Sequence, residues 1–79
     1  MPPEYSRLRW QCRRGMRELD VLLERFLDSR YDSSTEAQKS AFQALLELPD
    51  PELGLYLLQG VHPDSAQLAD IVRRILRED

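Results

Sequence analysis

Residues 16–31 read MRELDVLLERFLDSRY and show the clearest helical period in the chain. Apolar side chains recur at intervals of three and four, which places them along one side of a helix. Most of the remaining positions are charged or polar, so the segment predicts an amphipathic helix that faces a core. The expected stripe consists of Met16, Leu19, Leu22, Leu23, Phe26 and Leu27.

The segment before this helix carries a weaker version of the same pattern. Tyr5, Leu8 and Cys12 are spaced by three and four, which predicts a short helix over residues 5–13. Gly15 follows it and permits a turn or a close packing point. The two helices are therefore expected to meet near Gly15.

A capping-box spacing marks the start of the next helix. Ser33 precedes Glu36 by three residues, which predicts a helix over residues 34–48. Its inward-facing side chains are expected to be Ala41, Phe42, Leu45 and Leu46.

The sequence LPDPE at residues 48–52 then ends one helix and starts another. Asp50 suits the N-cap and Pro51 the first helical position, so a fourth helix is expected over residues 51–59, before Gly60. This helix is apolar on all sides, which implies that it is largely surrounded by protein. The side chains concerned are Leu53, Leu55, Tyr56, Leu57 and Leu58.

A fifth helix is expected over residues 64–77, with arginines in its last turn, where they favour the helix dipole. Its stripe is Leu68, Ile71, Val72, Ile75 and Leu76. No segment alternates as a strand does, and β-branched residues are few. The fold class predicted is all-α, a single five-helix bundle over residues 1–79.

Size and composition fit a folded globular domain, with 79 residues, 42% hydrophobic and 32% charged. The longest apolar stretch falls well short of the roughly 20 residues that span a bilayer, so no membrane insertion is expected. No secretory signal is visible, which favours the cytoplasm. The single cysteine excludes an internal disulfide and a cysteine-based metal site.

The net charge of −3 is unevenly distributed. Residues 7–17 contain five arginines and no acid, whereas the other 68 residues contain six basic and fourteen acidic side chains. Such asymmetry indicates either a surface for an acidic partner or neutralisation by carboxylates within the fold. The acidic remainder of the chain argues against nucleic-acid binding, because it would repel phosphate.

Catalytic groups are scarce in the sequence. Cys12 lies on the apolar side of its helix and is expected to be a core residue, and His62 is expected to be an exposed linker residue. Glu18 and Asp20 are about 200° apart around a helix, so they cannot act as an acid/base pair. The three isolated glycines do not form a phosphate-binding loop, and one Cys and one His cannot form a closed zinc site. We therefore expect neither an enzyme nor a metal protein.

The junction of the first two helices is the best candidate for a binding surface. If the helical register continues through Gly15, then Trp10, Arg14 and Glu18 share one face. Trp and Arg are enriched at interface hot spots, and a glycine lets a partner's backbone approach. The alternative is structural: Arg14 pairs with Glu18, Trp10 covers the edge of the core, and Gly15 only turns the chain.

The same stretch resembles the succinate dehydrogenase assembly (flavinylation) factors. The resemblance covers about residues 7–60 and is carried by the following runs. They are Trp10-x-Cys12-Arg13-Arg14-Gly15-Met16-x-Glu18-Leu19-Asp20 with Leu23 and Phe26, then Tyr31-Asp32-Ser33, Phe42-x-x-Leu45-Leu46-Glu47 and Asp50-Pro51-x-Leu53. Departures from the family pattern, such as Tyr56 where a Trp is common, lie outside the first run.

The resemblance implies a cytoplasmic, bacterial assembly factor that binds the flavoprotein subunit of succinate dehydrogenase and, in some bacteria, that of fumarate reductase. It implies that the factor promotes covalent attachment of FAD to that subunit, which carries the FAD. Because the sequence has no phosphate-binding loop, this chain is not expected to hold FAD tightly itself. The family's Arg-Gly-x-x-Glu motif falls on Arg14, Gly15 and Glu18, with Trp10, Arg13 and Asp20 as supporting surface. The free chain is expected to be a monomer. The competing interpretation is an antitoxin-like or other interaction module.

Overall fold

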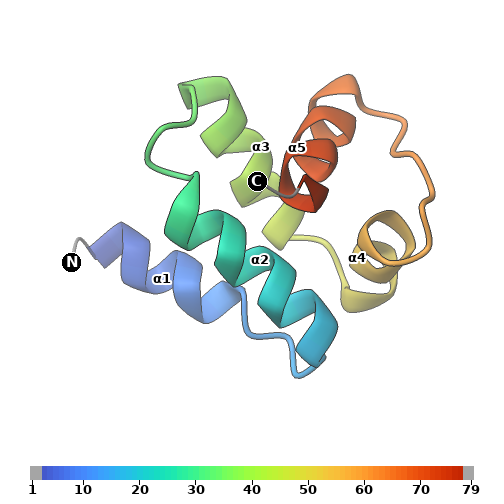
Figure 1. Cartoon of the computed structure of the whole chain (residues 1–79), viewed down its shortest axis with the longest axis horizontal. Coiled ribbons are helices and arrows are strands. Elements are labelled where there is room, and N and C mark those ends of the chain that lie inside the picture. The colour runs from blue at the N-terminus through green and yellow to red at the C-terminus, as the bar shows by residue number, and fades with distance from the viewer. Residues whose placement is uncertain (1–2, 78–79) are drawn as a thin grey trace.

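The computed structural model describes residues 3–77, with side chains from residue 5 onward. Five helices follow one another along the chain (Figure 1), and these residues contain no strand. The helices are α1 (Pro3–Gln11), α2 (Arg17–Ser29), α3 (Glu36–Leu46), α4 (Asp50–Leu57) and α5 (Ala66–Leu76). The all-α, five-helix prediction is confirmed. Within residues 3–77, none of the helices combines the length and apolar character needed to cross a bilayer.

The core lies where α2 and α3 pack against α5, with α1 alongside α2 and α4 in contact with α2 and α5 (Figure 1). The predicted stripe of α2 faces this core, and its buried members are Leu19, Leu23, Phe26 and Leu27. Leu22 is partly buried against the core, whereas Met16, which precedes the helix, is exposed. Apolar burial of this kind is the main force that holds a small helical domain together.

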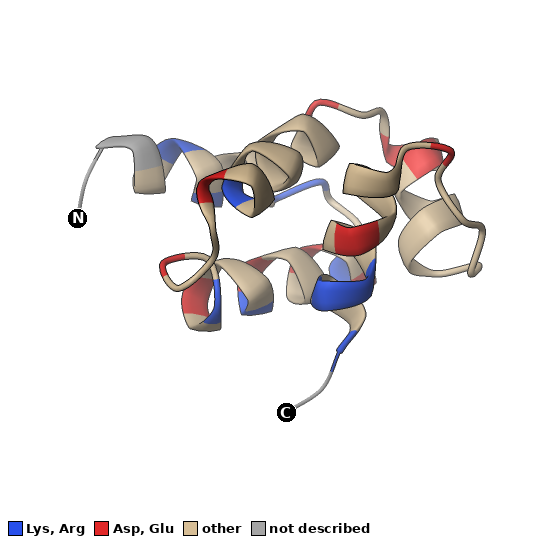
Figure 2. Ribbon diagram, turned by 90° about the horizontal axis from the view of Figure 1, so that it is seen from above, with Lys and Arg blue, Asp and Glu red and all other residues tan. Residues whose placement is uncertain are grey.

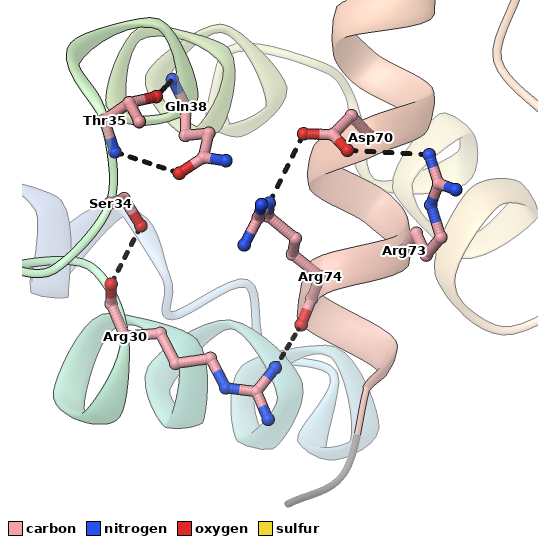
Figure 3. A network of polar contacts seen from close by, with 7 residues as sticks. All are labelled: Arg30, Ser34, Thr35, Gln38, Asp70, Arg73 and Arg74. Atoms are coloured by element: carbon pink, nitrogen blue, oxygen red, sulfur yellow. Dashed lines mark hydrogen bonds and ion pairs between the residues drawn. The ribbon is translucent and has the colours of Figure 1, made fainter.

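The start of α3 differs from the prediction. Thr35, not Ser33, is the N-cap, and it forms a capping box with Gln38 rather than with Glu36 (Figure 3). The two preceding serines are used elsewhere: the hydroxyls of Ser33 and Ser34 donate to the carbonyl of Arg30. These serines close the end of α2, so they are not available to open α3.

The end of α5 is fastened to α2 by arginine side chains. Arg30 donates from Nη1 to the carbonyl of Arg74 at 2.7 Å (Figure 3), and Arg25 donates to the carbonyl of Ile75 at 3.3 Å. These bonds satisfy carbonyls that the last turn of a helix leaves without a partner. Arg73 and Arg74 occupy that last turn as predicted.

Helix α4 departs from the prediction in two ways. Pro49 is its N-cap and Asp50 its first residue, so Asp50 does not cap the helix with its side chain. Leu55 and Leu58 are 38% and 40% exposed, so the expectation that α4 is surrounded was wrong. The helix has only eight residues, and its main contacts are with α2 and α5.

Candidate functional site: the α1–α2 loop

The predicted binding face is interrupted by a loop over residues 12–16, between the end of α1 and the start of α2. Gly15 has a φ of +80°, a left-handed conformation that breaks the helix and that side chains rarely adopt. The helical register therefore does not run through Gly15, and Trp10, Arg14 and Glu18 do not share one helical face. A Cβ at Gly15 would have no atom within 4 Å, so the glycine backbone is bare on its outer side.

Arg14 points into the fold rather than outward. Its Nε lies 3.0 Å from Asp50 Oδ1, Nη1 donates to the carbonyl of Gln11 at 3.1 Å, and Nη2 donates to the carbonyl of Leu48. The side chain is only 15% exposed. The sequence suggested that Arg14 either contacts a partner or pairs with Glu18, and the side chain instead bridges to the turn between α3 and α4.

Asp20, in the first turn of α2, forms a hydrogen bond with the backbone of the loop. Its Oδ1 accepts a hydrogen bond of 2.7 Å from the backbone N–H of Arg14. Asp20 is half-buried, so one carboxylate oxygen is committed to fixing the loop backbone. The sequence placed Asp20 on the supporting surface, and the structure gives it an internal contact.

The remaining predicted residues face solvent. Trp10 is 73% exposed, which rules out the alternative that it covers the edge of the core. The side chain of Glu18 is exposed and forms no hydrogen bond or ion pair with the described part of the chain. Arg13 is exposed, with its Nε 3.7 Å from Glu24. We call Trp10, Gly15, Met16 and Glu18, all exposed, the loop surface.

The basic segment is partly neutralised within the fold, because three of its five arginines form ion pairs with carboxylates. Figure 2 shows basic residues along α1 and the loop that follows it. The ion pairs that involve this segment are Arg9–Asp28, Arg13–Glu24 and Arg14–Asp50. Arg7 and Arg17 are exposed and remain available to an acidic partner.

Cys12 is fully buried beneath the loop, as the sequence predicted. Burial raises the pKa of its thiol to about 12, so at neutral pH the group is protonated and weakly nucleophilic. His62 is exposed in the connection between α4 and α5, also as predicted. In residues 3–77 no three His, Cys, Asp or Glu side chains are grouped as a metal site would require.

A concave region lies away from the loop, between the α4–α5 connection and α5. This open groove of about 830 Å³ is lined by apolar side chains that include Val61, Pro63 and Val72, with Arg73 beside them. None of the six predicted site residues lines it. The groove and the loop surface are thus separate features.

Comparison with known proteins shows the family of the chain. Residues 6–79 match the family described as flavinator of succinate dehydrogenase. The chain belongs to this family. This flavinator-family chain is 46% identical over 74 residues to the FAD assembly factor SdhE of Coxiella burnetii, covering 94% of the chain and 90% of the relative.

Two further relatives have the same name. The FAD assembly factor SdhE of Idiomarina loihiensis is 44% identical over 70 residues, covering 89% of the chain and 78% of the relative. That of Yersinia pseudotuberculosis is 41% identical over 70 residues, covering 89% and 80%. The family predicted from the run around Gly15 is confirmed.

Sequence reasoning missed one residue of this flavinator-family site. Asp50 was interpreted only as a helix cap, whereas its carboxylate faces the guanidinium of Arg14. A signal was present, because Asp50 belongs to one of the runs that carry the family resemblance. The carbonyl of Leu48 gave no such signal, since every residue has a backbone carbonyl.

Proposed function

We propose that this chain binds the flavoprotein subunit of succinate dehydrogenase and promotes the covalent attachment of FAD to it. Membership of the flavinator family and the shared name of its relatives support this proposal. The observation that carries it is the loop surface: an exposed Trp10, a bare Gly15 and a Glu18 without an internal partner. Tryptophan is a frequent hot-spot residue, and a bare glycine allows close backbone approach.

The chain acts on its partner's conformation rather than as a catalyst. Its one thiol is buried and protonated, and its one imidazole lies in an exposed connection, so neither supports nucleophilic chemistry. A binding protein shifts a conformational equilibrium only by its differential affinity for the two states. The chain therefore favours a flavoprotein conformation competent for flavin attachment, and leaves when the finished subunit prefers its mature form.

We further propose that FAD is carried by the flavoprotein and not held tightly by this chain. The three glycines, Gly15, Gly54 and Gly60, lie in separate segments, which does not fit a phosphate-binding loop. Titration of the purified chain with FAD is expected to give no tight complex. Submicromolar binding of free FAD would contradict this part of the proposal.

The proposal extends to the flavoprotein of fumarate reductase as a second partner, to the bacterial cytoplasm as the place of action, and to a monomeric free chain. Sedimentation of the purified chain at micromolar concentration is expected to give the mass of one copy, 9.3 kDa. The names of the relatives describe FAD assembly, so they do not support the antitoxin-like alternative.

The direct test is to reconstitute flavin attachment with purified flavoprotein subunit and FAD. After denaturing electrophoresis, in-gel fluorescence measures the flavin that stays covalently bound. We expect the wild-type chain to increase this signal and Glu18→Ala to reduce the increase. Glu36→Ala is the matched control, because Glu36 is likewise an exposed acid in the first turn of a helix. An unchanged signal with and without the wild-type chain would refute the proposal.

A further inference from the structure

Arg14 belongs to the motif that defines the candidate site, yet its guanidinium faces the protein interior. Resting on the proposed function, we propose that Arg14 is a positioning residue: with Asp50 it forms a clamp that sets the conformation of the loop surface and does not itself touch the partner. The clamp residues are Arg14, Asp20 and Asp50.

The side chain of Arg14 joins three separate segments. It reaches the carbonyl of Gln11 at the end of α1, the carbonyl of Leu48 in the α3–α4 turn, and the carboxylate of Asp50 at the start of α4. The planar guanidinium suits this task because it presents several donors in fixed directions. With 15% of the side chain exposed, little of it remains to meet another protein.

A separate hydrogen bond holds the backbone of the same residue. The N–H of Arg14 donates to Asp20 at 2.7 Å, so both the main chain and the side chain of this residue are fixed. Gly15 follows directly with its φ of +80°. The direction in which the bare glycine faces is therefore set by the clamp next to it.

Asp50 contacts Arg14 instead of capping its own helix. Aspartate is a preferred N-cap, but here Pro49 occupies that position and makes no side-chain cap bond, while Asp50 faces Arg14. Arg14 Nε is buried and lies 3.0 Å from Asp50 Oδ1 without the alignment of a hydrogen bond. The carboxylate thus acts through its charge, and the Asp50→Asn substitution removes that charge while keeping the shape.

The test is a double-mutant cycle on affinity for the flavoprotein subunit, using Arg14→Ala, Asp50→Asn and the double variant. If Arg14 acts through the clamp, Asp50→Asn weakens binding about tenfold, and the double variant binds no more than about threefold more weakly than Arg14→Ala. Asp28→Asn is the control, because it removes the ion pair between α1 and α2 without touching the loop. That variant is expected to bind as the wild type does.

A second readout needs no partner. The Arg14 amide donates to Asp20, so we expect its hydrogen exchange to be slow in the wild type. We expect Asp50→Asn to speed this exchange about tenfold or more, and Asp28→Asn to leave it unchanged. Three outcomes would each overturn the clamp. The first is that Asp50→Asn binds within twofold of the wild type. The others are that the affinity losses of the two single variants multiply in the double variant, or that exchange of the Arg14 amide is unchanged. If the wild-type chain does not increase covalent flavin on the flavoprotein, the proposed function is wrong. The amide exchange measurement still tests the clamp in that case, because it needs no partner.

Discussion

The stripe of α2 and the α1–α2 loop are adjacent in sequence but are held by different forces. Leu19 and Leu23 are fully buried and are fixed by apolar contact with the helices around them. The loop is fixed by a few directional contacts: the Arg14 ion pair with Asp50, the hydrogen bond to Asp20, and a backbone angle at Gly15 that suits glycine.

This difference separates two kinds of sensitivity. Apolar burial is non-directional and sums over many atoms, so losing part of the stripe reduces the stability of the whole domain. Loss of a loop contact changes one local conformation and the surface that the folded chain presents. We therefore expect substitutions in the stripe to lower the stability of the whole domain, and substitutions in the loop to act mainly on binding.

The largest effect is expected for Leu23→Ala, because Leu23 is fully buried in the middle of the stripe. Truncating such a side chain costs about 2–5 kcal/mol of unfolding free energy, a large share of what a domain of this size has. Urea unfolding followed by circular dichroism measures the loss. Val21→Ala, at an exposed position of the same helix, is the control and should change stability by less than about 0.5 kcal/mol.

The next effect is a pH dependence due to Cys12, whose thiol has a folded-state pKa of about 12 against an ordinary value of 9.0. Above pH 9 the thiol of the unfolded chain loses its proton while the buried thiol keeps it, so the folded state binds more protons. The stability due to the neutral thiol is complete below pH 9 and is lost as pH rises toward 12, by roughly 1.4 kcal/mol per pH unit.

Urea unfolding of the wild type and of Cys12→Ala between pH 7 and 10.5 isolates this effect. The difference in unfolding free energy between the two proteins should be constant up to about pH 8 and should shrink above pH 9. Other alkaline groups are common to both proteins and cancel in the difference. A difference that stays constant to pH 10.5 would show that the thiol does not titrate abnormally.

A smaller effect is expected at Gly15, where the backbone has φ +80° but the space outside is open. Gly15→Ala should cost about 1 kcal/mol through backbone strain alone, and Gly15→Asn less, because asparagine tolerates left-handed conformations. Thermal unfolding checks both variants. Equal stability of the Ala variant and the wild type would mean that the loop relaxes to another conformation.

The smallest effect is expected for Arg13→Ala, although Arg13 stands next to Arg14 in the sequence. Its pair with Glu24 is 3.7 Å long and its side chain is 66% exposed, so its removal should change stability by less than about 0.5 kcal/mol. Arg14→Ala should cost more, since that side chain is largely buried and joins three segments. Chemical denaturation of the two variants side by side measures the contrast.

Helical periodicity was sufficient to predict the fold and most of the core, because buried positions such as Leu23 and Phe42 recur with the helical repeat. Periodicity failed for Leu55 and Leu58, since an apolar residue does not reveal whether a neighbour exists to cover it. The capping-box spacing misplaced the α3 cap, because three hydroxyl residues in a row, Ser33, Ser34 and Thr35, offer more than one possible N-cap.

The sequence singled out the residues of the candidate site, but it did not predict how their side chains are oriented. Gly15 indicated a possible turn, yet the prediction of a shared face required a continuous helix across it. The inward direction of Arg14 depends on Asp50 and on the carbonyl of Leu48, which is 34 residues away along the chain. Only the packing of the α3–α4 turn beside the loop reveals that contact.

The central claim is that the bare backbone at Gly15 meets the flavoprotein. Its most direct test is the yield of covalent flavin on that subunit with the Gly15→Arg variant, at a temperature where circular dichroism shows the variant to be folded. We predict a folded chain that no longer increases covalent flavin, because a long side chain at this open position keeps the partner away. A folded Gly15→Arg variant that increases covalent flavin as much as the wild type would contradict the account.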